Sequence, residues 1–301
     1  MNPYYKDYAE FLSEHFQGKV QKISVNTGNV CPNRDGTLGR GGCIYCNNAA
    51  FTPDYAAPLL SVTEQLDRGI DFFRGKYPEM RYLAYFQSYT STNGDVDALM
   101  AQFREAAAHS GVAGIVIGTR PDCMPDELLS KLAELNRRTS VIIEYGAESA
   151  HNATLQLINR CHTWEQTVDA VSRTAKSGIP VGLHLILGLP GETQQMMLET
   201  VDAVNALPIA TVKFHQLQIV RGTALARAVE EGTLSVDTYS VDEYISLCVS
   251  IVYRLRRAIA IDRFTSQTPA ELLISPRWGL KNYQFTHRLL HRLAEEAGQH
   301  S

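Results

Sequence analysis

The chain has 301 residues, of which 45% are hydrophobic and 20% are charged, and its formal net charge at pH 7 is −4. This composition is that of a globular protein with one large domain, and it excludes the strong basic excess of a general nucleic-acid binder. Neither a signal peptide nor an apolar run of roughly 18 residues, as a membrane span requires, is present. We therefore expect a cytoplasmic protein with no membrane partner, whose six cysteines are ligands, reactive thiols or core residues rather than disulfides.

Six short runs rich in β-branched and aromatic residues are spaced along the first three quarters of the chain. Several are almost wholly apolar, as expected for parallel strands that are buried on both faces. The predicted strands are residues 20–25, 81–87, 112–118, 140–145, 181–187 and 211–220.

Helical patterns separate these runs. Two of them open with capping boxes, Ser61 with Glu64 and Thr163 with Gln166. The alternation of strands and helices predicts a parallel sheet, either open or curled into a barrel, between which periodicity does not choose. The predicted helices run from 61 to about 76 and over 95–109, 125–138, 163–178 and 193–206.

The alternation fades after residue 230. There we predict one long helix over 239–260, an edge strand over 261–267 and a final amphipathic helix over 282–298. We predict three parts: an N-terminal segment (1–18), a core domain (19–230) and a C-terminal extension packed on the core (231–301).

Three cysteines, Cys31, Cys43 and Cys46, follow the first strand within a glycine-rich stretch. A structural zinc site usually takes four protein ligands, and a 4Fe–4S cluster usually takes four cysteines. Three cysteines leave one iron of a cluster open to a non-protein ligand, which suits catalysis. A zinc site completed by a distant ligand and a set of redox thiols are the alternatives. Cys248 lies in an apolar helical stretch, which is typical of a core residue.

The stretch that begins Cys-Pro-Asn-Arg-Asp-Gly at Cys31 resembles the radical S-adenosylmethionine (SAM) superfamily. The similarity is to the branch of the Elongator catalytic subunit and the oxygen-independent coproporphyrinogen oxidases, above all to a bacterial group with eleven residues between the first two cysteines. It extends from about residue 19 to about residue 227. The resemblance implies a partial (β/α)6 TIM-like barrel with a C-terminal helical extension.

The resemblance also implies a mechanism. Cys31, Cys43 and Cys46 would hold a 4Fe–4S cluster, and SAM would bind the open iron. An external electron donor of the flavodoxin or ferredoxin type would reduce the cluster, and SAM would be cleaved to methionine and a 5′-deoxyadenosyl radical. That radical would take a hydrogen atom from the substrate. The protein positions and shields these groups.

SAM contacts are implied near the strand ends, where ligands gather in parallel α/β folds. The chain departs from its relatives at Glu148, where they have glutamine, at Cys161, where they have glycine, and at Gly118, where they often have an acid. A polar run from Gln87 replaces their glycines. The implied SAM-binding residues are Tyr45, Gln87, Ser88, Thr90, Arg120, Glu144, Glu148, Arg160, His184 and Gln218.

Some of these side chains have simpler interpretations. Arg120 can form an ion pair with Asp122, and His184 can be a core histidine with one hydrogen bond. Lys213 and His215 share one strand face. They can recognise an anionic substrate, or they can pair with a glutamate across the barrel.

The substrate is not identified by these motifs. A local excess of basic residues near the C-terminus predicts either an RNA-binding face or an ordinary solvated surface. Three hypotheses follow: a radical SAM enzyme acting on RNA or another anion, one acting on a small metabolite or protein side chain, and a non-catalytic zinc-binding adaptor. The basic residues are Arg254, Arg256, Arg257, Arg263, Arg277, Lys281, Arg288 and Arg292, against Asp262 and Glu271.

Overall fold

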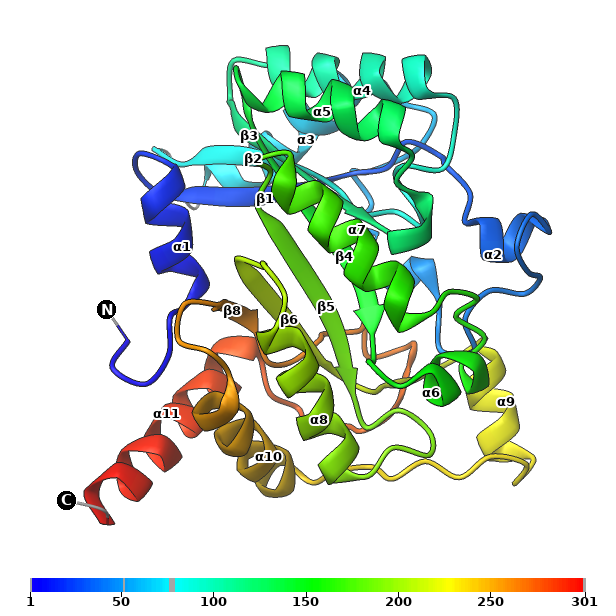
Figure 1. Cartoon of the computed structure of the whole chain (residues 1–301), viewed down its shortest axis with the longest axis vertical. Coiled ribbons are helices and arrows are strands. Elements are labelled where there is room, and N and C mark those ends of the chain that lie inside the picture. The colour runs from blue at the N-terminus through cyan, green and yellow to red at the C-terminus, as the bar shows by residue number, and fades with distance from the viewer. Residues whose placement is uncertain (1, 51, 76–78, 300–301) are drawn as a thin grey trace.

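The computed structural model describes residues 2–50, 52–75 and 79–299. Its central element is a seven-stranded sheet, all parallel, in the order β1-β2-β3-β4-β5-β6-β8. The sheet curls into a half-barrel, which confirms the partial TIM-like fold, and its seventh strand corresponds to the edge strand expected after residue 260 (Figure 1). The strands are β1 (Val20–Val25), β2 (Arg81–Phe86), β3 (Val112–Thr119), β4 (Ser140–Glu148), β5 (Val181–Leu187), β6 (Thr211–Gln216) and β8 (Ala260–Arg263).

Helices connect successive strands and cover the outer side of the sheet (Figure 1). Both predicted capping boxes are formed, at Ser61 and Thr163. The predicted end of the first of these helices, near 76, lies outside the described residues. The connecting helices are α3 (Val62–Arg74), α4 (Val96–Ala108), α5 (Asp126–Asn136), α7 (Trp164–Lys176), α8 (Gln194–Asn205) and α10 (Val241–Arg254). Shorter elements are α2 (Pro32–Asp35), η1 (Asn48–Ala50), η2 (Pro121–Cys123), α6 (Asn152–Leu157) and α9 (Ala224–Glu230).

Two of the predicted elements have the wrong boundaries. The strand expected over 211–220 ends at Gln216, and Ile219–Val220 form β7, which pairs antiparallel with β9 (Leu273–Ser275). Between the two strands, the side-chain amide of Gln218 donates to the Ser266 carbonyl and accepts from the Thr268 hydroxyl.

The long helix expected over 239–260 is also shorter than predicted. α10 ends at Arg254 because Leu255 adopts an extended conformation, and the chain turns there into β8. The edge strand is confirmed at a shifted position, since β8 is the last strand of the sheet and spans only four residues.

The two ends of the chain pack near the last strand. α1 (Tyr8–His15) contacts β8, and Asp7 forms a parallel bridge with Ile261. The bridge covers part of an otherwise exposed sheet edge. The final helix, α11 (Asn282–Gln299), packs on α10.

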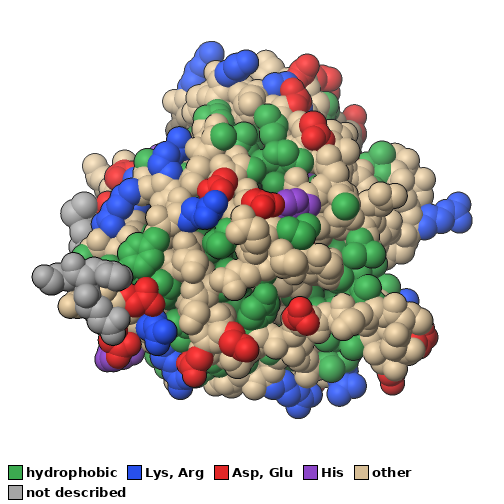
Figure 2. Space-filling model, turned by 60° about the horizontal axis from the view of Figure 1, so that its bottom comes forward, with side chains coloured by type: hydrophobic (Ala, Val, Ile, Leu, Met, Phe, Trp, Pro, Cys, Tyr) green, Lys and Arg blue, Asp and Glu red, His purple; other side chains and the backbone are tan. Residues whose placement is uncertain are grey.

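The described helices are all too short or too polar to cross a membrane. On the face shown in Figure 2, the coloured Lys and Arg side chains are interspersed with Asp and Glu. This face therefore presents mixed charge.

Candidate active site

A cavity of about 450 Å³ lies at the carboxyl ends of the strands and extends into the half-barrel. It brings together residues that are far apart in sequence, from Cys31 to Thr268. Ser88 is the one predicted site residue that does not line it, because its side chain is buried at the end of β2. The predicted residues that line the cavity are Cys31, Cys43, Tyr45, Cys46, Gln87, Thr90, Arg120, Glu144, Glu148, Arg160, His184 and Gln218.

The cysteine loop is fixed by Asn33, which is fully buried. Its amide donates to the carbonyl of Asn159 and lies 3.7 Å from the Cys43 Sγ. A side chain at Gly39 would place its Cβ 2.2 Å from the Asn33 Oδ1, so glycine is required there for the loop to pack. The loop between the first two cysteines is thus held against the turn that carries Arg160.

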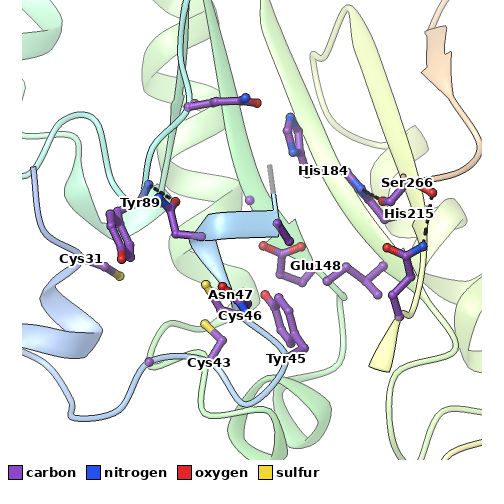
Figure 3. A pocket seen from close by; sticks show the side chains of 18 of the residues that line it. Cys31, Cys43, Tyr45, Cys46, Asn47, Tyr89, Glu148, His184, His215 and Ser266 are labelled. Carbon is purple, nitrogen blue, oxygen red and sulfur yellow. Dashed lines mark hydrogen bonds between the residues drawn. The ribbon is translucent and has the colours of Figure 1, made fainter. Parts of the chain in front are cut away.

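The sulfur atoms of Cys31, Cys43 and Cys46 face a common space in Figure 3, and we call these three residues the thiol rim. Two arginines lie beside them. The Arg160 Nη1 is 3.5 Å from the Cys43 Sγ, and the Arg34 Nη2 donates to the Cys46 carbonyl at 2.9 Å. Burial raises the pKa of the Cys46 thiol, and Cys43 raises it further, while Arg34 opposes both.

No three His, Cys, Asp or Glu side chains among the described residues are grouped closely enough to hold a single metal ion. The thiol rim does not need such a grouping for an iron–sulfur cluster, because each cysteine then binds a different iron. The donor set of three thiols on one cavity therefore fits a 4Fe–4S cluster.

Three polar atoms near the thiol rim are buried without a hydrogen-bond partner in the described part of the chain. They are the Arg120 Nη1, the Arg160 Nε and the Thr90 Oγ1. Buried polar atoms are nearly always satisfied in a complete structure. Since all three residues line the cavity, a ligand with carboxylate and hydroxyl groups such as SAM would supply the missing partners.

Arg120 and Arg160 each use their other atoms to hold the site in shape. Arg120 forms a bidentate pair with Asp122 at 2.9 and 2.8 Å, which confirms the simpler interpretation of that arginine. Arg160 donates to the Gly146 carbonyl at 2.6 Å and lies 3.2 Å from the Glu148 Oε1. Burial raises the pKa of Glu148, while Arg160 opposes that shift.

The described non-glycine residues with positive φ all lie at or beside this site. They are Tyr89, Glu148, Asn159 and Cys161, with φ between 52° and 66°. Such conformations are costly and concentrate at functional sites. Cys161 has φ of 60°, a conformation that glycine adopts without strain.

A second set of polar residues lies deeper, in the middle of the strands. Both oxygens of Glu144 are engaged: Oε1 by the Lys22 Nζ at 2.7 Å, and Oε2 by the Lys213 Nζ at 2.9 Å. Oε2 also accepts from the Tyr85 hydroxyl and the His184 Nε2, both at 2.8 Å. We call this set the floor network: Lys22, Tyr85, Glu144, His184, Lys213 and Asp262.

Asp262 completes the floor network by binding the same two lysines, at 2.9 Å from Lys22 and 3.4 Å from Lys213. The pairing of Lys213 with a glutamate across the barrel, predicted as one of two possibilities, is thereby confirmed. Burial raises the pKa of Asp262, but the two lysines outweigh it and bring that pKa to about 2.

Burial lowers the pKa of both histidines that line the cavity. Burial lowers the pKa of His184 to about 4. Lys213 also lowers this pKa, whereas Glu144 raises it. Burial also lowers the pKa of His215 well below its usual value, and Arg263 adds to that shift. The two rings lie 5.4 Å apart on neighbouring strands, and the His215 Nδ1 bonds Ser266 (Figure 3).

The predicted basic region does not form one surface. Arg254 pairs with Asp202, Arg256 donates to the Leu207 carbonyl and Arg257 donates to the Pro3 carbonyl. These arginines precede β8, so they lie at the opposite end of the sheet from the cavity. Arg263, by contrast, lines the cavity.

Several site residues were missed by sequence reasoning. Lys22 and Tyr85 were not singled out, and Asp262 and Arg263 were named only in describing the basic region. The available signal was a lysine, Lys22, inside a predicted strand of the sheet, because a buried charge needs a partner.

The comparison with family models decides the family. Residues 25–204 match the model of the radical SAM superfamily, and residues 209–295 match that of the radical SAM C-terminal domain. The chain belongs to the radical SAM superfamily. It is thus an enzyme of this class, and the zinc-adaptor hypothesis is set aside. Members of the superfamily bind a 4Fe–4S cluster and SAM, and they need an electron donor.

The chain is also similar to individual proteins. The chain is 37% identical to a Bacillus subtilis protein named uncharacterized protein YtqA, over 91% of this chain and 84% of the relative. It is 25% identical to the tRNA uridine(34) acetyltransferase of Methanocaldococcus infernus, over 58% of this chain and 32% of that protein. The solved structure of the Methanocaldococcus infernus Elp3 matches with a TM-score of 0.70 at 16% identity, over 94% of this chain and 64% of that one.

Proposed function

We propose that this enzyme binds a 4Fe–4S cluster on Cys31, Cys43 and Cys46 and cleaves SAM reductively at that cluster. The observation that carries the proposal is the thiol rim itself, with unpartnered buried atoms of Arg120, Arg160 and Thr90 around it. When bound, the reduced cluster and SAM supply a 5′-deoxyadenosyl radical that takes a hydrogen atom from the substrate.

The cavity residues have distinct parts in this function. Arg120 and Arg160 offer free N–H groups to the SAM carboxylate, and Thr90 and Glu148 offer hydroxyl and carboxylate groups to the polar parts of SAM. Tyr45, whose side chain lies beside Glu148 in Figure 3, supplies an aromatic face for the adenine. Five further residues stay predicted contacts of SAM: Gln87, Ser88, Gln218, and the floor residues Glu144 and His184.

Glu144 and His184 have a second role that limits their contact with SAM. Both oxygens of Glu144 already accept hydrogen bonds, and the His184 Nε2 serves one of them. We therefore propose that these two residues shape the inner wall of the cavity. A closed wall excludes water from a reactive radical.

Anaerobic reconstitution tests this function. We expect iron and sulfide near four per chain and release of 5′-deoxyadenosine from SAM when the protein is reduced with dithionite. The matched control is Cys248→Ala, because Cys248 is a buried core cysteine away from the cavity and should leave the iron content unchanged. One zinc per chain and no SAM cleavage would contradict the proposal.

We further propose that the substrate is RNA. A relative acts on tRNA by its name, and a cleft of about 910 Å³ adjoins the cavity, with Gln216, Gln218 and Ser266 lining both. The described residues that line this cleft include Arg277, Lys281 and no carboxylate. A basic cleft that leads to a reactive cavity suits a strand that delivers one nucleotide.

Two charge reversals of equal size test the RNA proposal. Arg277→Glu with Lys281→Glu alters the cleft, whereas Arg256→Glu with Arg257→Glu alters the opposite end of the sheet. We expect the cleft pair to weaken tRNA binding about tenfold or more at low salt and to flatten its salt dependence. Equal effects of both pairs, or no binding by the wild type, would favour a small metabolite or a protein side chain as substrate.

The electron donor and the compartment complete the proposal. We propose a flavodoxin or a ferredoxin as donor, and the cytosol as the place of action, because the three thiols must stay reduced to bind iron. Reduction by a flavodoxin system in place of dithionite should support SAM cleavage.

A further inference from the structure

Arg263 is the last residue of β8, and its side chain lines the cavity beside the floor network. No hydrogen bond or ion pair of its guanidinium is found within the described residues, and its Nε is buried without a partner. The other cavity arginines are each engaged: Arg120 by Asp122, Arg160 by Glu148 and Arg34 by the Cys46 carbonyl. Arg263 is thus a cation without a direct ion-pair partner among the described residues, although its charge acts with the two lysines to lower the pKa of Asp262.

The carboxylates of the floor network do not neutralise it. Glu144 and Asp262 are both occupied by Lys22 and Lys213, at 2.7 to 3.4 Å. Arg263 adds a third positive charge to two lysines and two carboxylates. The inner part of the cavity therefore has an excess of positive charge at neutral pH.

The remaining neighbours of Arg263 are donors or neutral groups. It pairs in register with Lys213 across β6 and β8. His215 uses Nδ1 for Ser266, which leaves Nε2 for a ligand. In the tautomer in which the Ser266 hydroxyl donates to Nδ1, Nε2 carries the N–H, and a guanidinium with such a donor nearby can bind carboxylate or phosphate oxygens.

We propose that Arg263, with His215, binds an anionic group of the substrate, a carboxylate or a phosphate, at the inner end of the cavity. This inference rests on the proposed function, since it concerns the substrate of the same site. The SAM carboxylate is assigned to Arg120 and Arg160 at the thiol rim, so the two anions occupy different ends of the cavity. Arg263 thereby fixes which end of the substrate is turned away from the thiol rim.

The test uses the reconstituted enzyme, both without and with SAM, and inorganic phosphate and acetate as probes. The midpoint of thermal unfolding is measured while sodium phosphate or sodium acetate replaces sodium chloride at constant ionic strength, which keeps screening fixed. We expect the midpoint to rise with saturation for at least one probe. The probe that saturates at the lower concentration identifies the anion as phosphate or carboxylate.

Variants assign the effect to Arg263. Arg263→Gln should weaken the apparent affinity for the probe about tenfold or more, and Arg263→Lys should retain it within about threefold, because the charge remains. The matched control is Arg292→Gln, which removes an exposed arginine paired with Glu296 in α11 and should match the wild type. Arg263→Lys also guards against a loss that reflects misfolding of Arg263→Gln.

Two results would overturn the inference. One is an equal midpoint shift in the wild type and Arg263→Gln. The other is loss of the shift when SAM is added, which would mean that the probe occupies the place of the SAM carboxylate. In either case, SAM cleavage by the same wild-type preparation would leave the proposed function intact, whereas its absence would count against the function itself.

Discussion

The thiol rim and the floor network are both polar clusters in one cavity, yet they differ in how completely their groups are bonded. Around the thiol rim, atoms of Arg120, Arg160 and Thr90 have no partner within the described residues. In the floor network, both oxygens of Glu144 are bonded to neighbouring side chains. The difference indicates that the rim is built for a ligand, while the floor network joins the strands of the half-barrel.

The largest expected effect is on stability at the floor network. Glu144→Gln removes a buried carboxylate that neutralises Lys22 and Lys213. We expect a loss of roughly 3–5 kcal/mol in the free energy of unfolding, because breaking a buried ion pair leaves charges uncompensated. Denaturant unfolding of the iron-free protein measures it.

Glu148→Gln is the matched control, since it makes the same change beside the thiol rim. Glu148 has one ion pair, and burial already raises its pKa. We expect a loss of about 1 kcal/mol. Equal losses for the two variants would show that the rim and the floor do not differ in structural role.

The floor network should also make the stability of the protein depend on pH. The pKa of His184 is about 4 in the folded protein, against 6.5 for an unperturbed histidine. The unfolded chain therefore binds the proton first, so stability falls as the pH drops from about 6.5 to about 4, by roughly 2–3 kcal/mol for this residue.

His184→Gln isolates that contribution, because its amide can still donate to Glu144 without titrating. The slope of the free energy of unfolding against pH reports how many more protons the unfolded chain binds than the folded protein. Between pH 4.5 and 6, this number should be smaller by about one in the variant than in the wild type. An unchanged slope would mean that His184 does not titrate in this range.

At the thiol rim, the expected effect is on iron rather than on the fold. Cys46→Ser should lower the bound iron to background after reconstitution, because one of the three cysteine ligands is lost. The iron-free protein should lose only about 1 kcal/mol or less, since the Cys46 side chain is partly exposed. A variant that keeps four irons would remove Cys46 from the ligand set.

The smallest effect is expected at Cys161. Its thiol donates to the Asn33 Oδ1, but the residue is exposed and has positive φ. Cys161→Gly relieves that conformation while losing the contact, so stability should change by less than about 0.5 kcal/mol, with iron content unchanged. A loss of iron would instead give Cys161 a role in the cluster loop.

The sequence predicted the rim better than the floor, for a physical reason. Cys31, Cys43 and Cys46 lie within one short stretch, and Arg120 and Arg160 follow strands whose ends must meet at one edge of a parallel sheet. The floor network joins Lys22 to Asp262 across 240 positions. A single charge in each of several strands carries no pattern, so their meeting depends on the curvature and register of the sheet.

The two wrongly predicted element boundaries, of one strand and one helix, also depend on contacts between segments that are remote in sequence. Gln218 was expected in a continuous strand, but its partners Ser266 and Thr268 come from a segment that is remote in sequence. The helix that ends at Arg254 was predicted to continue to residue 260, through a stretch that includes the apolar residues Leu255 and Ile259. Those residues are buried at the sheet edge instead, as Ile259 and Ile261 show.

The electron paramagnetic resonance spectrum of the reduced, reconstituted protein, recorded with and without SAM, tests the central claim most directly. The account predicts one 4Fe–4S signal per chain that changes when SAM is added, because one iron lacks a cysteine and takes SAM as its ligand. A cluster signal that SAM leaves unchanged, or reconstitution with zinc and no cluster signal, would contradict it.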